Sequence, residues 1–192
     1  FTQSEIFIGE YWTSRVQKWF PKPEIQMMAA TFGAMESIHA VSYAYLNQSL
    51  GLEDFDAFLD EPSSKAKIER LMHVPAATTP KDIARSLAIF SAFSEGVKLF
   101  SAFAILLNFS RTNKMKGLGQ IIAFSIKDEA LHSEAGCWLY RQLVREFPEA
   151  HDVGAIVEAS EATVALEEAF IDQAFSAGPV EGLTAENAET AT

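Results

Sequence analysis

The fold is decided by one stretch of the chain, IQMMAATFGAMESIHAVSYAYLNQSL, which covers residues 25–50. Glu36 is the only Asp, Glu, Lys or Arg in this stretch. Pro23 precedes it and Gly51 follows it, and proline suits the first turn of a helix whereas glycine commonly ends one. We therefore predict a helix from about residue 24 to 50 that is buried on nearly all sides and carries one carboxylate in its middle.

The remainder of the chain repeats this pattern of apolar helices, and no segment shows convincing strand-like alternation. We expect further long helices at about residues 1–20, 79–109, 118–146 and 149–177. Thr79, Pro80 and Asp82 match the cap, the first residue and the acidic third position of a helix start. The sequence thus predicts an all-α protein with a single domain over residues 1–192, in which the polar residues 184–192 are frayed.

Composition excludes several classes of protein. The chain is 48% hydrophobic and 21% charged, which excludes a disordered tail or a collagen-like fibre. A net charge of −11 without a basic cluster argues against nucleic acid as a partner. No run of about 18 apolar residues is free of charged and polar groups, so we expect no membrane span. Cys137 is the only cysteine, which indicates a reducing compartment and hence a cytoplasmic protein.

One four-residue pattern, Glu-x-x-His, occurs twice, at residues 36–39 and 129–132. Residues three apart share a helix face, so each helix points a carboxylate and an imidazole to one place. Two further glutamates stand alone on other apolar helices. The resulting candidate metal ligands are Glu5, Glu36, His39, Glu95, Glu129 and His132.

This donor set has a specific chemical meaning. One glutamate from each of two helices and Glu-x-x-His from each of two others form the ligands of ferritin-like di-iron and di-manganese proteins. Oxygen-rich sites with some imidazole suit iron or manganese. Four carboxylates balance the charge of two divalent ions, whereas four clustered anions without metal would be costly to bury. A single Glu-x-x-His is commonly a surface pair, but the joint pattern on four apolar helices predicts a dinuclear metal site.

Tyr43 lies four residues after His39 and seven after Glu36, so the three side chains share one helix face. A phenol beside a redox-active metal pair can be oxidised to a radical if apolar side chains protect it. The alternative interpretation is a core tyrosine with a hydrogen-bonded hydroxyl. Tyr45 lies about 200° further round the same helix and is a matched control.

These motifs resemble the small, radical-generating subunit of class I ribonucleotide reductase. The segment ESIHAVSY at 36–43 is similar to that family's Glu-x-x-His followed by the radical tyrosine. SEGV at 94–97 resembles its Glu-Gly helix, and DEALH at 128–132 resembles its Asp-Glu-x-x-His signature. The similarity covers about residues 1–177. It implies a ferritin-like helical bundle with a dinuclear metal site between four long helices, and an oxidoreductase that serves deoxyribonucleotide synthesis.

The resemblance also assigns roles to single residues. It implies that one metal is bound by Glu5, Glu36 and His39 and the other by Glu95, Glu129 and His132. It implies that Asp128 orients His39 for proton-coupled electron transfer, whereas the alternative is an acid on a helix surface. It further implies apolar walls around the radical tyrosine, formed by Leu99, Phe103 and Ile122. By periodicity alone these three are simply core residues.

The implied cofactor is a pair of iron ions, with manganese–iron or manganese–manganese as alternatives. The family usually has Asp at the first ligand position, where this chain has Glu5. Some relatives with Glu there use manganese and iron and have lost the tyrosine, but Tyr43 is present here.

The implied partners are a second copy of the chain in a homodimer, a separate large subunit that carries the nucleotide site, and dioxygen or a reduced oxygen species. The chain starts at Phe1, within a helical pattern and without Met, so we expect an N-terminal segment to be missing. The family's tryptophan upstream of the first ligand and its C-terminal docking tail also lie outside the chain.

Two other classes share parts of this pattern. A stand-alone di-metal oxidase or monooxygenase shares the six ligands, but it requires a substrate channel and no large subunit. An iron-storage protein shares the bundle, but it usually lacks the second Glu-x-x-His and forms a cage. A radical signal separates the first alternative, and oligomer size separates the second.

Overall fold

The computed structural model describes residues 2–52, 60–72, 77–176, 178–184 and 186. Helices dominate this part of the chain, and its only strand-like pairing is an isolated β-bridge between Val180 and Leu183. The prediction of an all-α protein is therefore confirmed. The chain forms two compact units, residues 1–73 and 74–192. The single-domain assignment stays a prediction, and most of the segment predicted to be frayed, residues 185 and 187–192, lies outside the described residues.

The first unit is built on two long helical segments that lie side by side. Its described helices are α1 (Thr2–Glu10), the π-helical turn η1 (Tyr11–Val16), α2 (Gln17–Trp19), α3 (Pro23–Ser49) and α4 (Pro62–Met72). The helix predicted at residues 1–20 is present but contains the wide turn η1, which the apolar pattern did not reveal. The helix predicted at about 24–50 is confirmed to within one residue at each end.

Close contact between the two long segments of the first unit depends on an aromatic pair and on a glycine. Trp12 is fully buried, and its ring lies edge-on to Phe32 with 4.9 Å between centroids. A Cβ atom placed on Gly33 would overlap with Thr13 Cγ2, so only glycine lets α3 approach η1 this closely. The packing therefore fixes which face of α1 meets α3.

The turn between α2 and α3 is closed by two side-chain amides. Gln17 Nε2 donates to the carbonyl of Gln26 at 3.0 Å, and Gln26 Nε2 donates to the carbonyl of Gln17 at 2.8 Å. Gln26 also donates to the carbonyl of Phe20, an acceptor at the end of the helix. These bonds hold the two segments in register from the turn onward.

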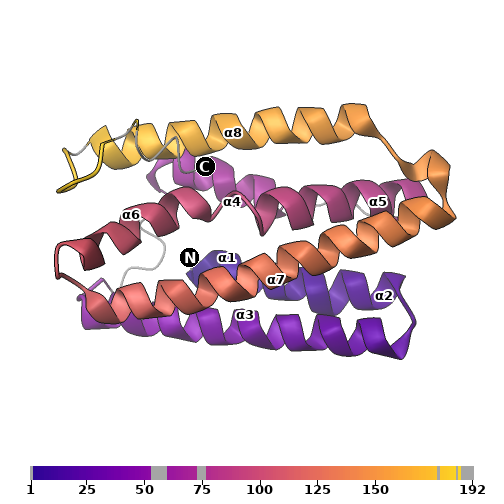
Figure 1. The fold of residues 1–192 in the computed structure, drawn as a ribbon, viewed down its shortest axis with the longest axis horizontal. Helices are drawn as coiled ribbons and strands as arrows, with labels where there is room; N and C mark the ends of the chain where they lie inside the picture. The colour runs from indigo at the N-terminus through magenta and orange to yellow at the C-terminus, as the bar shows by residue number, and fades with distance from the viewer. Residues whose placement is uncertain (1, 53–59, 73–76, 177, 185, 187–192) are drawn as a thin grey trace. The chain divides into compact units, whose positions relative to one another are not determined.

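The second unit contains the longest described helix, α7 (Figure 1). Its described elements are α5 (Pro80–Ala88), the π-helical turn η3 (Ile89–Ser94), α6 (Phe100–Arg111), α7 (Lys116–Glu146), the 3₁₀ turn η4 (Pro148–Ala150) and α8 (Val153–Ser176). The capping box predicted at the start of α5 is confirmed, because Asp82 N donates to Thr79 Oγ1 at 3.2 Å and Thr79 N donates to Asp82 Oδ2 at 3.1 Å.

Two helix predictions for the second unit were wrong in detail. The helix expected to run unbroken over 79–109 is interrupted by η3 and by non-helical turns at 95–99, where Figure 1 shows the ribbon breaking between α5 and α6. The helix expected from 149 begins at Val153 instead. Pro148 starts a 3₁₀ turn there, and Asp152 Oδ1 accepts from Ala155 N at 3.1 Å and so caps the true start of α8.

Candidate functional site

The first unit brings together Glu5 from α1 and Glu36 and His39 from α3, which we call the first triad. His39 Nδ1 lies 3.4 Å from Glu36 Oε2 and 3.9 Å from Glu5 Oε2. The three side chains each offer a ligand atom within 4.8 Å of the others. Glu5 is 0% exposed, Glu36 1% and His39 4%. The sequence prediction that these three residues share one location is consistent with this geometry.

The second unit brings together Glu95, Glu129 and His132, which we call the second triad. His132 Nδ1 lies 3.8 Å from Glu95 Oε2 and 3.7 Å from Glu129 Oε2. All three side chains are fully buried, and their ligand atoms also lie within 4.8 Å of one another. The second triad therefore repeats the chemistry of the first: one glutamate from one segment and a Glu-x-x-His pair from a helix.

Each triad is suited to a divalent transition-metal ion. Two carboxylates supply two negative charges and hard oxygen donors, and the imidazole adds a nitrogen donor. Burying two carboxylates beside each other is costly without a compensating charge, and a divalent cation supplies that charge. The donor chemistry of the residues present therefore fits a metal centre of the kind the sequence predicts.

Glu95 owes its position to an irregular backbone. It follows η3, and its N–H donates to the carbonyl of Phe90, five residues earlier, at 3.0 Å. A Cβ atom placed on the next residue, Gly96, would overlap with the carbonyl oxygen of Ala92 and would lie 3.1 Å from Ser133 Oγ. Only glycine fits at this point, so Gly96 lets the chain carry Glu95 close to α7.

Tyr43 is buried on the same face of α3 as the first triad. Its side chain is 3% exposed, and its ring centroid lies 6.4 Å from that of His39. Tyr45, the control residue on the same helix, is 66% exposed. Only one of the two tyrosines is therefore sheltered beside a candidate ligand.

The other predicted site residues all lie in the second unit. Leu99, Phe103 and Ile122 are buried, with exposed fractions of 7%, 1% and 0%. Asp128 is half-buried on α7, directly before Glu129. The contacts predicted for these four residues with Tyr43 and His39 reach into the first unit, and they stay predictions.

Sequence reasoning missed a buried acid in the second unit. Glu167 on α8 is 1% exposed and accepts a hydrogen bond from the hydroxyl of Ser101 on α6. The sequence did contain a signal for its burial, because Glu167 lies in a row of residues spaced four apart on one face of α8. The buried residues of this face are Ala155, Ala159, Thr163, Glu167 and Ile171. Lys98, another buried polar residue, donates from Nζ to Ser94 Oγ at 3.2 Å.

None of the described helices combines the length and the apolar character that a bilayer crossing requires.

Comparison with known proteins gives consistent results. A family model described as "Ribonucleotide reductase, small chain" matches residues 1–190. The probable ribonucleoside-diphosphate reductase small subunit 048L of Invertebrate iridescent virus 3 is 36% identical over 99% of this chain and 56% of its own length. The probable ribonucleoside-diphosphate reductase small subunit 376L of Invertebrate iridescent virus 6 is 31% identical over 91% of this chain and 55% of its own.

A solved structure described as a class I ribonucleotide reductase from Bacillus halodurans has the same fold. The TM-score is 0.83 at 20% identity, and the match covers 98% of this chain and 74% of that one. This likeness confirms the prediction of a ferritin-like helical fold. The chain spans about half the length of the curated viral relatives, at 56% and 55%.

Proposed function

Because the chain belongs to the ribonucleotide reductase small-chain family, we propose that it is the radical-generating part of a ribonucleoside-diphosphate reductase small subunit. In this role it is an oxidoreductase that makes and stores a one-electron oxidant for deoxyribonucleotide synthesis. The observation that carries the proposal is the pair of buried triads, each with two glutamates and one histidine. An iron-storage role is not favoured, because both Glu-x-x-His pairs are buried with a third carboxylate.

The cofactor in this proposal is a dinuclear metal centre. The first triad holds one ion and the second triad holds the other, so that four carboxylates balance two divalent charges. Two iron ions are the primary assignment, with manganese–iron or manganese–manganese as alternatives because Glu5 stands where the family usually has Asp. When bound, the metals supply oxygen activation and one-electron oxidation.

Tyr43 is the residue that stores the oxidising equivalent. It gives up one electron and its hydroxyl proton, which leaves a neutral tyrosyl radical. Its burial, and its position one turn after His39, support this role, since water and exposed reductants are kept away. Leu99, Phe103 and Ile122 are assigned as apolar walls around the ring. Asp128 is assigned as the acid that orients His39.

The proposed partners follow from the family. Nucleotide reduction requires a separate large subunit that carries the nucleotide site, and the chain itself forms a homodimer. Dioxygen or a reduced oxygen species serves as the oxidant. The single cysteine supports a cytoplasmic location.

The test of this function is metal content combined with electron paramagnetic resonance. We expect close to two transition-metal ions per chain and a tyrosyl signal after exposure to oxidant. Glu95→Gln should lower metal affinity by about 100-fold or more, since partners outside the coordination shell already cost 10–100-fold when changed. The matched control is Glu24→Gln, at an exposed position of α3, which should leave affinity unchanged.

A stand-alone oxidase gives a different result in the same assays. It would consume oxygen with an organic substrate and show no dependence on a large subunit. Wild-type protein that binds one ion or none per chain would contradict the proposed function.

A further inference from the structure

A pocket of about 250 Å³ lies between α1 and α3 in the first unit. It is referred to below as the α1–α3 pocket. Its lining residues are Glu5, Ile6, Gly9, Glu10, Thr13, Gly33, Glu36, Ser37 and Ala40. Two members of the first triad therefore face a hollow that other residues of the same two segments complete.

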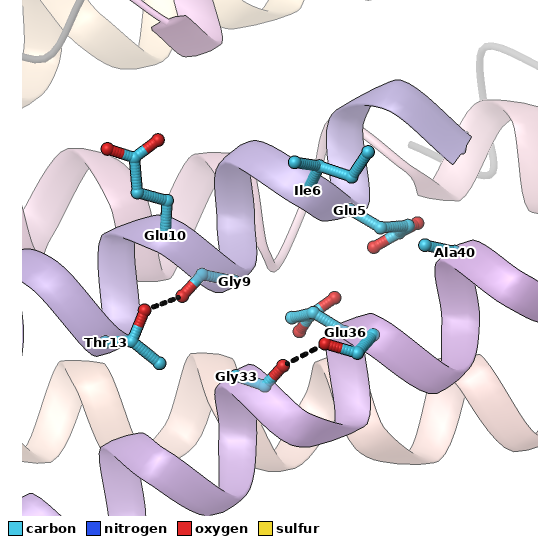
Figure 2. Close-up of a pocket in the computed structure, with 9 residues that line it drawn as sticks. Glu5, Ile6, Gly9, Glu10, Thr13, Gly33, Glu36 and Ala40 are labelled. Carbon is cyan, nitrogen blue, oxygen red and sulfur yellow. Dashed lines mark hydrogen bonds between the residues drawn. The ribbon is translucent and has the colours of Figure 1, made fainter.

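The α1–α3 pocket lies between exposed residues and the two buried glutamates of the first triad. Ile6 is 55% exposed and Glu10 is exposed, whereas Glu5 and Glu36 are 0% and 1% exposed. Figure 2 shows Glu5 and Glu36 pointing into the space between the two helices and Glu10 extending from the outer side of α1. Glu5 and Glu36 thus line the inner side of the pocket, where their carboxylate oxygens are shielded from solvent, and Glu10 lines its outer side.

The polar groups of the lining are mainly hydrogen-bond acceptors. Thr13 Oγ1 donates to the carbonyl of Gly9 at 2.9 Å, and Ser37 Oγ donates to the carbonyl of Gly33 at 3.0 Å. Each hydroxyl proton is therefore used within its own helix, and the hydroxyl oxygens keep lone pairs for another group. The lining residues include three glutamates and no Lys, Arg or His.

These features select for a cation. An anionic molecule would meet three carboxylates without a balancing positive charge, whereas a divalent ion is attracted by all of them. The volume also fits, because 250 Å³ corresponds to roughly eight water molecules at ~30 Å³ each, enough for a partly hydrated ion. Gly9, Gly33 and Ala40 keep the pocket open, because larger side chains at these positions would fill it.

We propose that divalent metal ions reach the first triad through the α1–α3 pocket and that Glu10 accelerates their arrival by raising the local cation concentration at its opening. The proposal rests on the proposed function, because it assumes that the first triad binds metal. It assigns Glu10 a role in the rate of loading and none in the bound centre.

The experiment measures the rate at which the metal-free chain takes up Co²⁺, followed by stopped-flow visible absorbance. Glu10→Gln should slow loading about threefold at low ionic strength, because one steering charge is lost. The difference should disappear at high salt, and equilibrium affinity should stay unchanged. The matched control, Glu24→Gln, removes the same charge from an exposed position outside the pocket and should load at the wild-type rate.

A second pair of variants tests the passage itself. Ala40→Leu fills the α1–α3 pocket and should slow loading tenfold or more at every salt concentration. Ala34→Leu places the same side chain at an exposed position of α3 outside the pocket and should have no effect. Circular dichroism verifies that both variants fold. If Ala40→Leu does not fold, the test rests on Glu10→Gln, which changes an exposed side chain.

Wild-type loading rates in both Glu10→Gln and Ala40→Leu, with two ions still bound per chain, would overturn this inference and leave the proposed function intact. Unchanged loading combined with a slower reaction of the loaded Ala40→Leu protein with oxidant would also overturn it, and would assign the pocket to the oxidant instead. Failure of the wild type to bind metal would refute the proposed function and this inference together.

Discussion

The two triads have the same side chains but are built in different ways. In the first triad, Glu36 and His39 stand on a long regular helix, and Glu5 is brought to them by a close helix–helix contact at Gly33. In the second triad, Glu95 reaches Glu129 and His132 because its own helix is broken by a π-helical turn and by Gly96. One donor set is thus positioned by packing between helices, and the other by the path of the backbone.

The surroundings of the triads differ as well. His39 is followed four residues later by buried Tyr43, whereas the equivalent position after His132 is Gly136, which has no side chain to oxidise. The first triad also faces the α1–α3 pocket through Glu5 and Glu36. Both the tyrosine that we propose as the redox side chain and the proposed loading route therefore lie in the first unit.

The largest expected effect comes from removing the hydroxyl of Tyr43, the side chain that has no counterpart beside the second triad. Tyr43→Phe removes the oxidisable hydroxyl but keeps the buried ring, so metal content should be retained. Activity with the large subunit should fall to background and the tyrosyl signal should vanish, as measured by nucleotide reduction and electron paramagnetic resonance. Tyr45→Phe, at a 66% exposed position, should change neither. Full activity of Tyr43→Phe would mean that the stored oxidant resides on the metals and would make Glu5 the feature to explain.

Adding one methyl group at Gly96 tests whether the path of the backbone positions the second triad. Gly96→Ala should destabilise the protein by about 1–3 kcal/mol, because the new Cβ overlaps with the Ala92 carbonyl. Metal affinity should fall at one of the two sites only, which titration can resolve. Gly117→Ala in α7 is the control, since nothing lies within 4 Å of its Cβ position, and unfolding by denaturant should show no loss of stability there. Equal losses in the two variants would refute the role given to Gly96.

The helix–helix contact that positions the first triad can be disrupted by one substitution and restored by a second. Gly33→Ala should cost about 1–3 kcal/mol of unfolding free energy, because its Cβ meets the methyl group of Thr13. Thr13→Ser removes that methyl group and keeps the hydroxyl that bonds to Gly9. The double variant should therefore regain most of the loss, and a double-mutant cycle measures this coupling. Additive effects would argue against the contact.

The smallest expected effect is a dependence of stability on pH that arises from Asp82 at the start of α5. Hydrogen bonds from Thr79, first its side chain and then its backbone, hold the pKa of Asp82 below its ordinary value of 3.8. Because the pKa is lower in the folded state, this carboxylate stabilises α5 above pH 3.8 and the contribution disappears as the pH falls through the folded pKa. Thr79→Ala should flatten this part of an acid titration followed by circular dichroism, whereas an unchanged profile would show that the capping box contributes nothing.

The sequence predicted regular helices better than irregular ones. The ends of α3 were predicted closely because Pro23 and Gly51 mark them and Glu36 is the only charge over residues 25–50. The break between α5 and α6 was missed because apolar residues continue through η3, and Gly96 alone does not distinguish a wide turn from a tolerated glycine. Local spacing reports which residues share a helix face, but not where the backbone leaves the helix.

The same limit applies to the candidate site. Four of the six candidate ligands were identified because Glu-x-x-His spacing is a local signal, and Glu5 and Glu95 because each is an isolated carboxylate on an apolar helix. Glu167 was missed because its partner Ser101 is distant in sequence, so the contact that accompanies its burial cannot be seen in local spacing. The contact between Gly33 and Thr13 is equally invisible in the sequence, since it depends on how two helices approach.

The π-helical turn η3 has a consequence for insertions and deletions. A π-helical turn holds one residue more than the α-helical turn it replaces, because its hydrogen bonds join residues five apart. Removing one residue from Ile89–Ser94 would therefore let the helix return to regular α geometry and keep the helix faces on either side roughly in register. Removing one residue from α5 itself would instead turn everything after it by about 100°, so that the apolar face of α5 and the carboxylate of Glu95 no longer both face inward. A one-residue deletion should thus be tolerated better within η3 than within α5.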